Sequence, residues 1–363
     1  MLGAGLRPDE KRKRSGRGCI RLVLMVLLAG VMTDGAIAQD NAVRLFISGH
    51  SLTDRPLPDM VAAMAHHDGI QIDWDRQHIG GSTIRQRTFG NDEKRPGSGY
   101  SAGVNRDGDP VDVLATLASP PPHDIFVVTE WHRVLDVLTS HETIRHLRDF
   151  QTRAVSANPG AKTYFYAPWA DIADPGKPDA WIDYERSASP VWHCIAVRAG
   201  EGTGPVDFIP ASLALADLVA YLNSEKPQGF TGATPGEITA HLFTDHVHLT
   251  DPGVYFVALI TYGTLFGGNL SQAWMPAGAD PLQAGTLRAF ASGFMERWRD
   301  REDDQTDCKT LPSGFISTYT SYMQTAYTNA EMGVFRASVK RMRDTLRLSW
   351  RFHGWGDNPL GTQ

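Results

Sequence analysis

The sequence predicts an α/β protein built on a parallel central sheet. Short apolar segments alternate with segments of helical spacing along most of the chain. Residues 45–47 are apolar and end in a tight turn of small and polar residues before helical spacing begins, which is the pattern of a strand, a turn and a helix. Residues 124–129 are almost continuously apolar, as strands of parallel sheets tend to be because both their faces are buried.

The elements expected from this alternation follow in chain order. Strands are expected at residues 41–47, 70–74, 124–129, 162–169 and 207–211, and helices at 58–67, 111–117, 139–156, 191–197, 214–222 and 252–266. The polar segments 89–112 and 171–190 show no apolar period, so we expect them as loops that shape a substrate mouth at the sheet edge. Two amphipathic helices are expected beyond the sheet, at 282–299 and 316–346.

The first 38 residues have the composition of a secretory signal peptide. Six basic residues between positions 11 and 21 precede the apolar run 22–32, and Ala36 and Ala38 occupy the positions that a signal peptidase reads. The run is too short to cross a bilayer as a helix, which takes about 20 residues. We therefore expect an exported protein, periplasmic or secreted, without stable membrane insertion after signal removal. Its parts would be the signal peptide 1–38, a sheet domain 39–270 and a helical extension 271–363.

Composition and charge limit the partners of the chain. Hydrophobic residues make up 42% of the 363 residues, which is ample for a buried core, and the formal net charge is −6 with the basic leader included. A negative chain disfavours nucleic acid and anionic membrane surfaces as partners. Cys194 and Cys308 follow the leader, and in an exported protein they could form one disulfide, although the sequence does not show that they meet.

Ser51 is a candidate nucleophile because it follows the first strand. Open α/β sheets bind ligands at the carboxyl ends of their strands, and the positive N-terminus of the next helix would lie close to the hydroxyl. An alternative interpretation is that Ser51 only caps that helix.

Asp245 and His248 provide an acid and a base far downstream, on a loop that approaches another helix. Their spacing of three allows the carboxylate to accept a hydrogen bond from the imidazole, which fixes the tautomer that takes the serine proton. A serine nucleophile requires such a base because its hydroxyl barely ionises at neutral pH.

Both segments resemble a known family. Residues 49–52, Gly-His-Ser-Leu, resemble the Gly-Asp-Ser-Leu nucleophile block of the SGNH (GDSL) hydrolase superfamily, and residues 245–249, Asp-His-Val-His-Leu, resemble its terminal Asp-x-x-His-Leu block. The resemblance implies a flavodoxin-like three-layer sandwich. It also implies an esterase or lipase-type hydrolase with a triad of Ser51, His248 and Asp245. His50 stands where the family usually has aspartate.

The resemblance also implies an oxyanion hole. A glycine after the second strand would offer its amide together with the Ser51 amide; Gly80 and Gly81 are both eligible, and we prefer Gly81. A Gly-Gly turn without a catalytic task is the alternative. The asparagine block that the family places after the third strand is absent, because residues 130–133 read Glu-Trp-His-Arg. His132 is expected to act as a donor in its place.

Three further residues at this sheet edge are predicted to contact substrate. Glu130 and Trp131 follow the third strand, and Trp169 ends the fourth. A tryptophan suits stacking on a sugar or packing an acyl chain, but a core position is an equal alternative. Glu130 would oppose a developing oxyanion, so we expect it to bind or orient another group.

No cofactor is expected. Three histidines lie close together in sequence, at positions 241, 246 and 248, but they lack a convincing ligand set for a metal. The sequence thus predicts an exported serine esterase that acts on a small-molecule or glycan ester, with O-acetyl groups on carbohydrate preferred. Two alternatives stay open: a non-catalytic glycan-binding protein, which the missing asparagine favours, and a polysaccharide O-acyltransferase.

Overall fold

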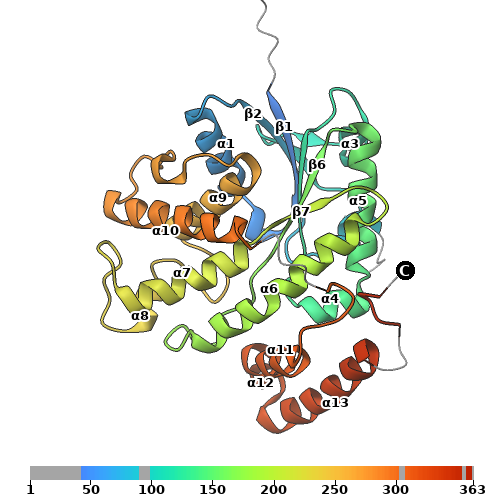
Figure 1. The fold of residues 1–363 in the computed structure, drawn as a ribbon, viewed down its shortest axis with the longest axis vertical. Helices are drawn as coiled ribbons and strands as arrows, with labels where there is room; N and C mark the ends of the chain where they lie inside the picture. The colour runs from blue at the N-terminus through green and yellow to red at the C-terminus, as the bar shows by residue number, and fades with distance from the viewer. Residues whose placement is uncertain (1–41, 90–98, 302–306, 354–356, 362–363) are drawn as a thin grey trace, which may run out of the picture. The chain divides into compact units, whose positions relative to one another are not determined.

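A seven-stranded sheet lies at the centre of the residues that the computed structural model describes, which are 42–89, 99–301, 307–353 and 357–361. The strand order is β4-β3-β2-β1-β5-β6-β7. The five strands β2, β1, β5, β6 and β7 run parallel to one another. Counted alone, these five have the order 2-1-3-4-5 of flavodoxin-like sheets. Helices cover both faces (Figure 1), which confirms the predicted three-layer α/β fold. The predicted signal peptide lies outside the described residues.

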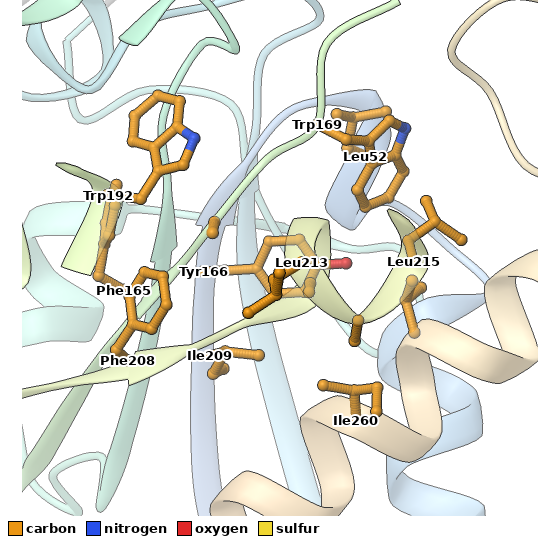
Figure 2. Close-up of a cluster of buried hydrophobic side chains, with 14 of the residues drawn as sticks. Leu52, Phe165, Tyr166, Trp169, Trp192, Phe208, Ile209, Leu213, Leu215 and Ile260 are labelled. Carbon is orange, nitrogen blue, oxygen red and sulfur yellow. The ribbon is translucent and has the colours of Figure 1, made fainter. Parts of the chain in front are cut away.

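Each parallel strand overlaps a predicted one. Their bounds are β1 (Val43–Gly49), β2 (Ile72–His78), β5 (Ile125–Thr129), β6 (Lys162–Tyr166) and β7 (Val206–Ile209). All five residues of β5 are buried, because helices pack on both of its faces. Figure 2 shows part of the resulting core, in which buried side chains of β6 and β7 meet those of the neighbouring helices.

The helices form two layers. On one face α1 (Leu57–His67) and α9 (Asp251–Phe266) pack together, with α7 (Ala211–Glu225) beside α9; α3 (Val113–Ala118), α5 (Thr143–Ala157) and α6 (Asp179–Gly200) lie on the other (Figure 1). Three shorter helices complete this part of the chain: α2 (Ile84–Phe89), α4 (Val134–Ser140) and α8 (Pro235–Thr239). The connections between strands and helices carry the candidate functional residues.

Both segments that we expected as loops contain regular structure. The edge strands β3 (Gly103–Asn105) and β4 (Pro110–Val111) form a short antiparallel extension of the sheet. Only a glycine fits at position 103, since a Cβ there would lie 2.4 Å from the Val111 carbonyl oxygen. Helix α6 begins at Asp179 and continues through Pro190, which removes one backbone hydrogen bond. Buried aromatic side chains stabilise this helix, among them Trp181, Tyr184 and Trp192.

In the described part of the chain beyond α9, four α-helices follow a short 3-10 turn (Leu270–Gln272). Helix α10 (Pro281–Arg299) packs on α9, whereas α11 (Phe315–Met323) packs on α6. A π-helical turn (Gln324–Thr328) and α12 (Asn329–Met332) lead to α13 (Val334–His353), which folds back on α11 (Figure 1). The prediction of one continuous helix over 316–346 is wrong. The helix ends at Gly333, whose φ of +78° is left-handed and favours glycine.

A disulfide joins Cys194 on α6 to Cys308, ahead of α11, across a sequence separation of 114 residues. Replacing both cysteines by alanine is expected to lower the free energy of unfolding by about 2–4 kcal/mol, because the cross-link restricts the unfolded chain. Urea unfolding followed by circular dichroism would measure the change. Reduced wild-type protein should unfold like the variant, and equal midpoints for the oxidised protein and the variant would contradict the prediction.

Candidate active site

Ser51 lies two residues beyond the end of β1, at the start of the short helical turn Ser51–Thr53. Its position depends on His50, whose Nδ1 accepts the Leu52 amide at 3.4 Å while Nε2–H donates to the Glu130 carbonyl oxygen at 2.8 Å. His50 thus holds the turn against the end of β5. The Ser51 side chain is left exposed, whereas His50 is buried.

His248 and Asp245 reach Ser51 from the loop before α9. The Nε2 atom of His248 lies 3.2 Å from the Ser51 Oγ, and its Nδ1–H donates to the Asp245 Oδ2 at 2.7 Å. The Asp245 Oδ1 accepts the amides of Val247 and His248, each at 2.7 Å. The carboxylate therefore fixes both the backbone turn and the imidazole ring. The structure brings the three predicted triad residues together across a separation of 197 positions.

The charge on Asp245 is well stabilised. Partial burial alone would raise its pKa, but hydrogen bonds from the His248 ring and from the amides of His248 and Val247 lower the pKa of Asp245 to about 2. The group is therefore a carboxylate at neutral pH. The Asp245 and His248 side chains are about half exposed, at 51% and 48%. The triad consequently lies at the surface, open to a bulky reactant.

Buried groups hold the loop that carries His248. The Trp169 indole donates to the Val247 carbonyl oxygen at 2.8 Å. The Ile172 amide donates to the His246 carbonyl oxygen at 2.7 Å, and the His246 ring Nδ1–H donates to the Ile172 carbonyl oxygen at 2.8 Å. Trp169 is only 1% exposed and belongs to the core cluster that Figure 2 shows. This burial contradicts the predicted substrate contact for Trp169 and gives it a positioning role, the core alternative that the sequence left open.

Glu130 is also buried. Its Oε1 accepts the amides of Ile84 at 3.0 Å and Trp131 at 2.7 Å, and its Oε2 accepts the Thr143 hydroxyl at 2.7 Å. Burial raises the pKa of Glu130, although these hydrogen bonds and the Arg87 charge oppose the shift. The predicted substrate contact of Glu130 is therefore contradicted as well, because both oxygens are used inside the fold.

Arg87 is a residue of the site region that sequence reasoning missed. Its buried guanidinium donates to the Ser48 hydroxyl and the Ser82 carbonyl oxygen, both at 3.0 Å, and to the carbonyl oxygen of Thr129. Burial lowers its pKa to about 10, opposed by the charge of Glu130. Arg87 thereby ties the ends of β1 and β5 to the loop after β2. The sequence did contain one indication of a buried polar partner, because Ser48 is a polar residue within an otherwise apolar strand.

The Gly80–Gly81 turn lies in that same loop. The Ile79 amide donates to the Gly49 carbonyl oxygen at 3.1 Å, which brings the turn next to the Ser51 segment. Gly81 is exposed and has a left-handed φ of +60°, and its amide donates no hydrogen bond within the described part of the chain. The turn is available for the oxyanion role, which remains a prediction.

His132 and Trp131 lie where the C-terminal helices meet the sheet edge. The His132 ring stacks on Tyr327 at a centroid distance of 5.7 Å, and its Nε2 is 3.7 Å from the Asp171 Oδ1. Trp131 is partly exposed, with the Arg133 guanidinium 4.8 Å from its ring centroid. Trp131 is thus accessible to a substrate. No hydrogen bond joins His132 to Ser51 among the described residues, so its donor role remains a prediction.

Two histidines near the site, His50 and His132, make stability dependent on pH. Burial is the main cause that lowers the pKa of both His50 and His132 to about 3, against 6.5 when exposed. As the pH falls below 6.5 the unfolded chain binds protons that the folded chain does not, so stability is lost. From pH 7 to pH 5 each histidine is expected to cost about 2 kcal/mol of unfolding free energy. In urea unfolding at both pH values, His132→Gln should lose about 2 kcal/mol less than wild type, and an unchanged loss would contradict this.

Comparisons with known proteins bear on the fold. A scan against protein-family models finds no match, and a search of curated proteins finds none. Among solved structures, the crystal structure of a DUF4886 family protein from Bacteroides uniformis is similar, with a TM-score of 0.52 and 15% sequence identity. The similarity covers 70% of this chain and 95% of that one. At this identity the likeness establishes the fold alone.

No group of three or more His, Cys, Asp or Glu side chains with the geometry to hold a metal ion is found among the residues that the structure describes. In the same residues, no helix combines the length and the apolar character that crossing a membrane requires.

Proposed function

We propose that this protein is a serine esterase that works through an acyl-enzyme intermediate. The observation that carries the proposal is the continuous relay from the Ser51 hydroxyl through His248 to Asp245, with heavy-atom distances of 3.2 and 2.7 Å. This is the geometry by which a nucleophile, a base and an orienting acid act together.

Each residue has a defined step in this mechanism. The Ser51 Oγ attacks the ester carbonyl carbon as its proton moves to the His248 Nε2, and Asp245 stabilises the imidazolium. Collapse of the tetrahedral intermediate breaks the bond to the alcohol, which receives the proton from Nε2. Water, deprotonated by the same nitrogen, then attacks the acyl-enzyme and releases the acid and free Ser51.

The oxyanion would be held by backbone amides. We assign this role to the amides of Ser51 and Gly81, with His132 as a third donor. The Gly81 amide donates no hydrogen bond to the residues that the structure describes, and the turn lies next to the Ser51 segment; both observations support this assignment. The neutral state of His132 is compatible with N–H donation, since burial lowers its pKa to about 3.

We further propose that the ester is an O-acetyl group on a carbohydrate. Support comes from the half-exposed triad, because an open site admits a polymer as the alcohol part, and from Trp131, whose partly exposed ring suits a sugar face. An exported location, periplasmic or secreted, fits such a substrate. It is supported by the leader composition and by the Cys194–Cys308 disulfide, since disulfides persist in oxidising compartments.

Labelling with a fluorophosphonate tests the proposal directly. We expect one covalent adduct, located on Ser51 by peptide mass spectrometry, together with hydrolysis of p-nitrophenyl acetate and release of acetate from an acetylated polysaccharide. Absence of both labelling and turnover would exclude an esterase. It would favour the non-catalytic glycan-binding alternative, which the missing oxyanion asparagine supports. Acetyl transfer to an added sugar in preference to water would instead identify an O-acyltransferase.

A further inference from the structure

Helix α13 exposes a row of large apolar side chains. The row, named here the α13 stripe, consists of Phe335, Val339, Met342, Leu346 and Trp350, with exposed fractions from 50% for Val339 to 81% for Phe335. Successive members are three or four residues apart, which places them on one side of an α-helix. The stripe is therefore continuous along most of the helix.

The stripe is not the side of α13 that packs on the protein. The packed side carries Ala337, Leu348 and Phe352, which are buried, and the Thr345 hydroxyl, which lies 2.9 Å from that of Thr320 on α11. α13 thus has two apolar sides, of which one is used within the fold and the other faces outward. A soluble chain rarely leaves so long an apolar row uncovered without a partner for it.

Cations border the stripe. Helix α13 contains six Lys and Arg residues and one acidic residue, Asp344. Arg336, Arg343 and Arg347 are exposed and project along one edge of the stripe, at helical positions next to Val339 and Trp350. The only carboxylate in the helix is already paired, because Asp344 contacts Lys340 and Arg343. Arg347 also lies 3.8 Å from Asp136 of α4. With six cations on the helix and these two carboxylates beside them, α13 keeps a net positive charge, although the whole chain has a net charge of −6.

We propose that α13 binds the surface of an anionic lipid bilayer. The helix would lie parallel to the surface, with the stripe between the acyl chains and the bordering arginines on the lipid phosphates. A basic helix with large apolar residues on one side is the pattern of interfacial membrane binding. Charge complementarity also selects this partner over a second copy of the chain. Two stripes packed together would bring arginine borders into proximity, and the carboxylates beside these borders, Asp344 and Asp136, are already paired within each chain.

An anionic bilayer as partner differs from the expectation drawn from net charge. The negative total disfavours anionic surfaces only if charge is spread evenly, whereas the fold gathers positive charge on one exposed helix. The contact is peripheral, and it is independent of any catalytic role of Ser51.

Vesicle sedimentation with the full chain tests the proposal. Wild type is expected to pellet with vesicles of phosphatidylglycerol and phosphatidylcholine in equal parts and to stay in solution with phosphatidylcholine alone. The variant Phe335→Ser/Met342→Ser/Leu346→Ser should lower partitioning at least about tenfold. Arg336→Gln/Arg343→Gln should lower it about fivefold for each charge removed. Leu282→Ser, which alters an apolar side chain 56% exposed on α10, is the matched control and should bind as wild type does.

Three results would overturn the proposal. The first is that wild type fails to bind the anionic vesicles, and the second is that the stripe variant binds them as well as wild type. The third is a dimer of wild type in light scattering that the stripe variant abolishes, which would assign the stripe to a second copy. Circular dichroism of each variant verifies that α13 remains folded.

Discussion

Ser51→Ala is expected to lower kcat for p-nitrophenyl acetate by on the order of 10⁶-fold, as removal of the nucleophile does in a well-studied triad. The reason is that no other described side chain offers a hydroxyl at the His248 Nε2, so the acyl-enzyme cannot form. The fold should not change, because the Ser51 side chain is exposed and its only side-chain hydrogen bond among the described residues is the one to His248.

The matched control for this variant is Ser313→Ala, which removes another exposed serine hydroxyl, in the segment before α11. We expect it to keep the wild-type turnover, and both variants to keep the wild-type melting temperature. Fluorophosphonate labelling should disappear in Ser51→Ala alone. Turnover by Ser51→Ala within tenfold of wild type would remove Ser51 from the nucleophile role and the proposed mechanism with it.

The triad was predictable because its parts are local in sequence. Asp245 and His248 are three residues apart, so their hydrogen bond depends on one turn, and Ser51 follows a strand whose apolar pattern is plain. Ser51 reaches the carboxyl edge of the sheet because it follows β1. The loop of Asp245 and His248 follows α8 and no strand of the sheet, so its meeting with Ser51 was expected from the family resemblance of the two segments and not from the strand pattern.

The neighbours of the triad were not predictable in this way. Whether Trp169 or Glu130 points outward depends on which side chains fill the space behind each strand end, and a sequence pattern does not specify this. Glu130 is satisfied by groups from α2 and α5, and Arg87 by groups from three separate segments. Such buried polar networks form only when distant elements meet, and each member must find a partner because an unpaired buried charge is costly.

The elements that were wrongly predicted have a similar cause. Helix α6 continues past Pro190 because its buried aromatic residues outweigh one lost hydrogen bond, which is a tertiary effect. The 316–346 pattern concealed a reversal because Gly333 interrupts the helix without interrupting the apolar period. Periodicity describes which residues share a face. It does not reveal whether that face is packed, as on α11, or exposed, as in the α13 stripe.

Asp245→Asn is expected to lower kcat by at least about 100-fold, towards the 10⁴-fold found when a buried triad aspartate is changed in this way. The carboxamide oxygen of the substituted side chain can still accept the loop amides, but its NH₂ group would then face the His248 Nδ1. The ring would be held as the tautomer with its proton on Nε2, which cannot accept the Ser51 proton. We expect a smaller loss of kcat than in a buried triad, because the Asp245 side chain is 51% exposed and water can partly replace the carboxylate as a hydrogen-bond partner of His248.

Asp251→Asn is the matched control, because it removes one carboxylate in the first turn of α9, six residues beyond Asp245. Its turnover should stay within about twofold of wild type, since surface substitutions away from a site have small effects. Because Asp245 is ionised down to about pH 2, loss of its charge should reduce kcat in wild type only in strong acid, so the defect of Asp245→Asn should persist from pH 6 to pH 9. If Asp245→Asn retained wild-type turnover over that range, His248 would be oriented by another group and the relay would end at the imidazole.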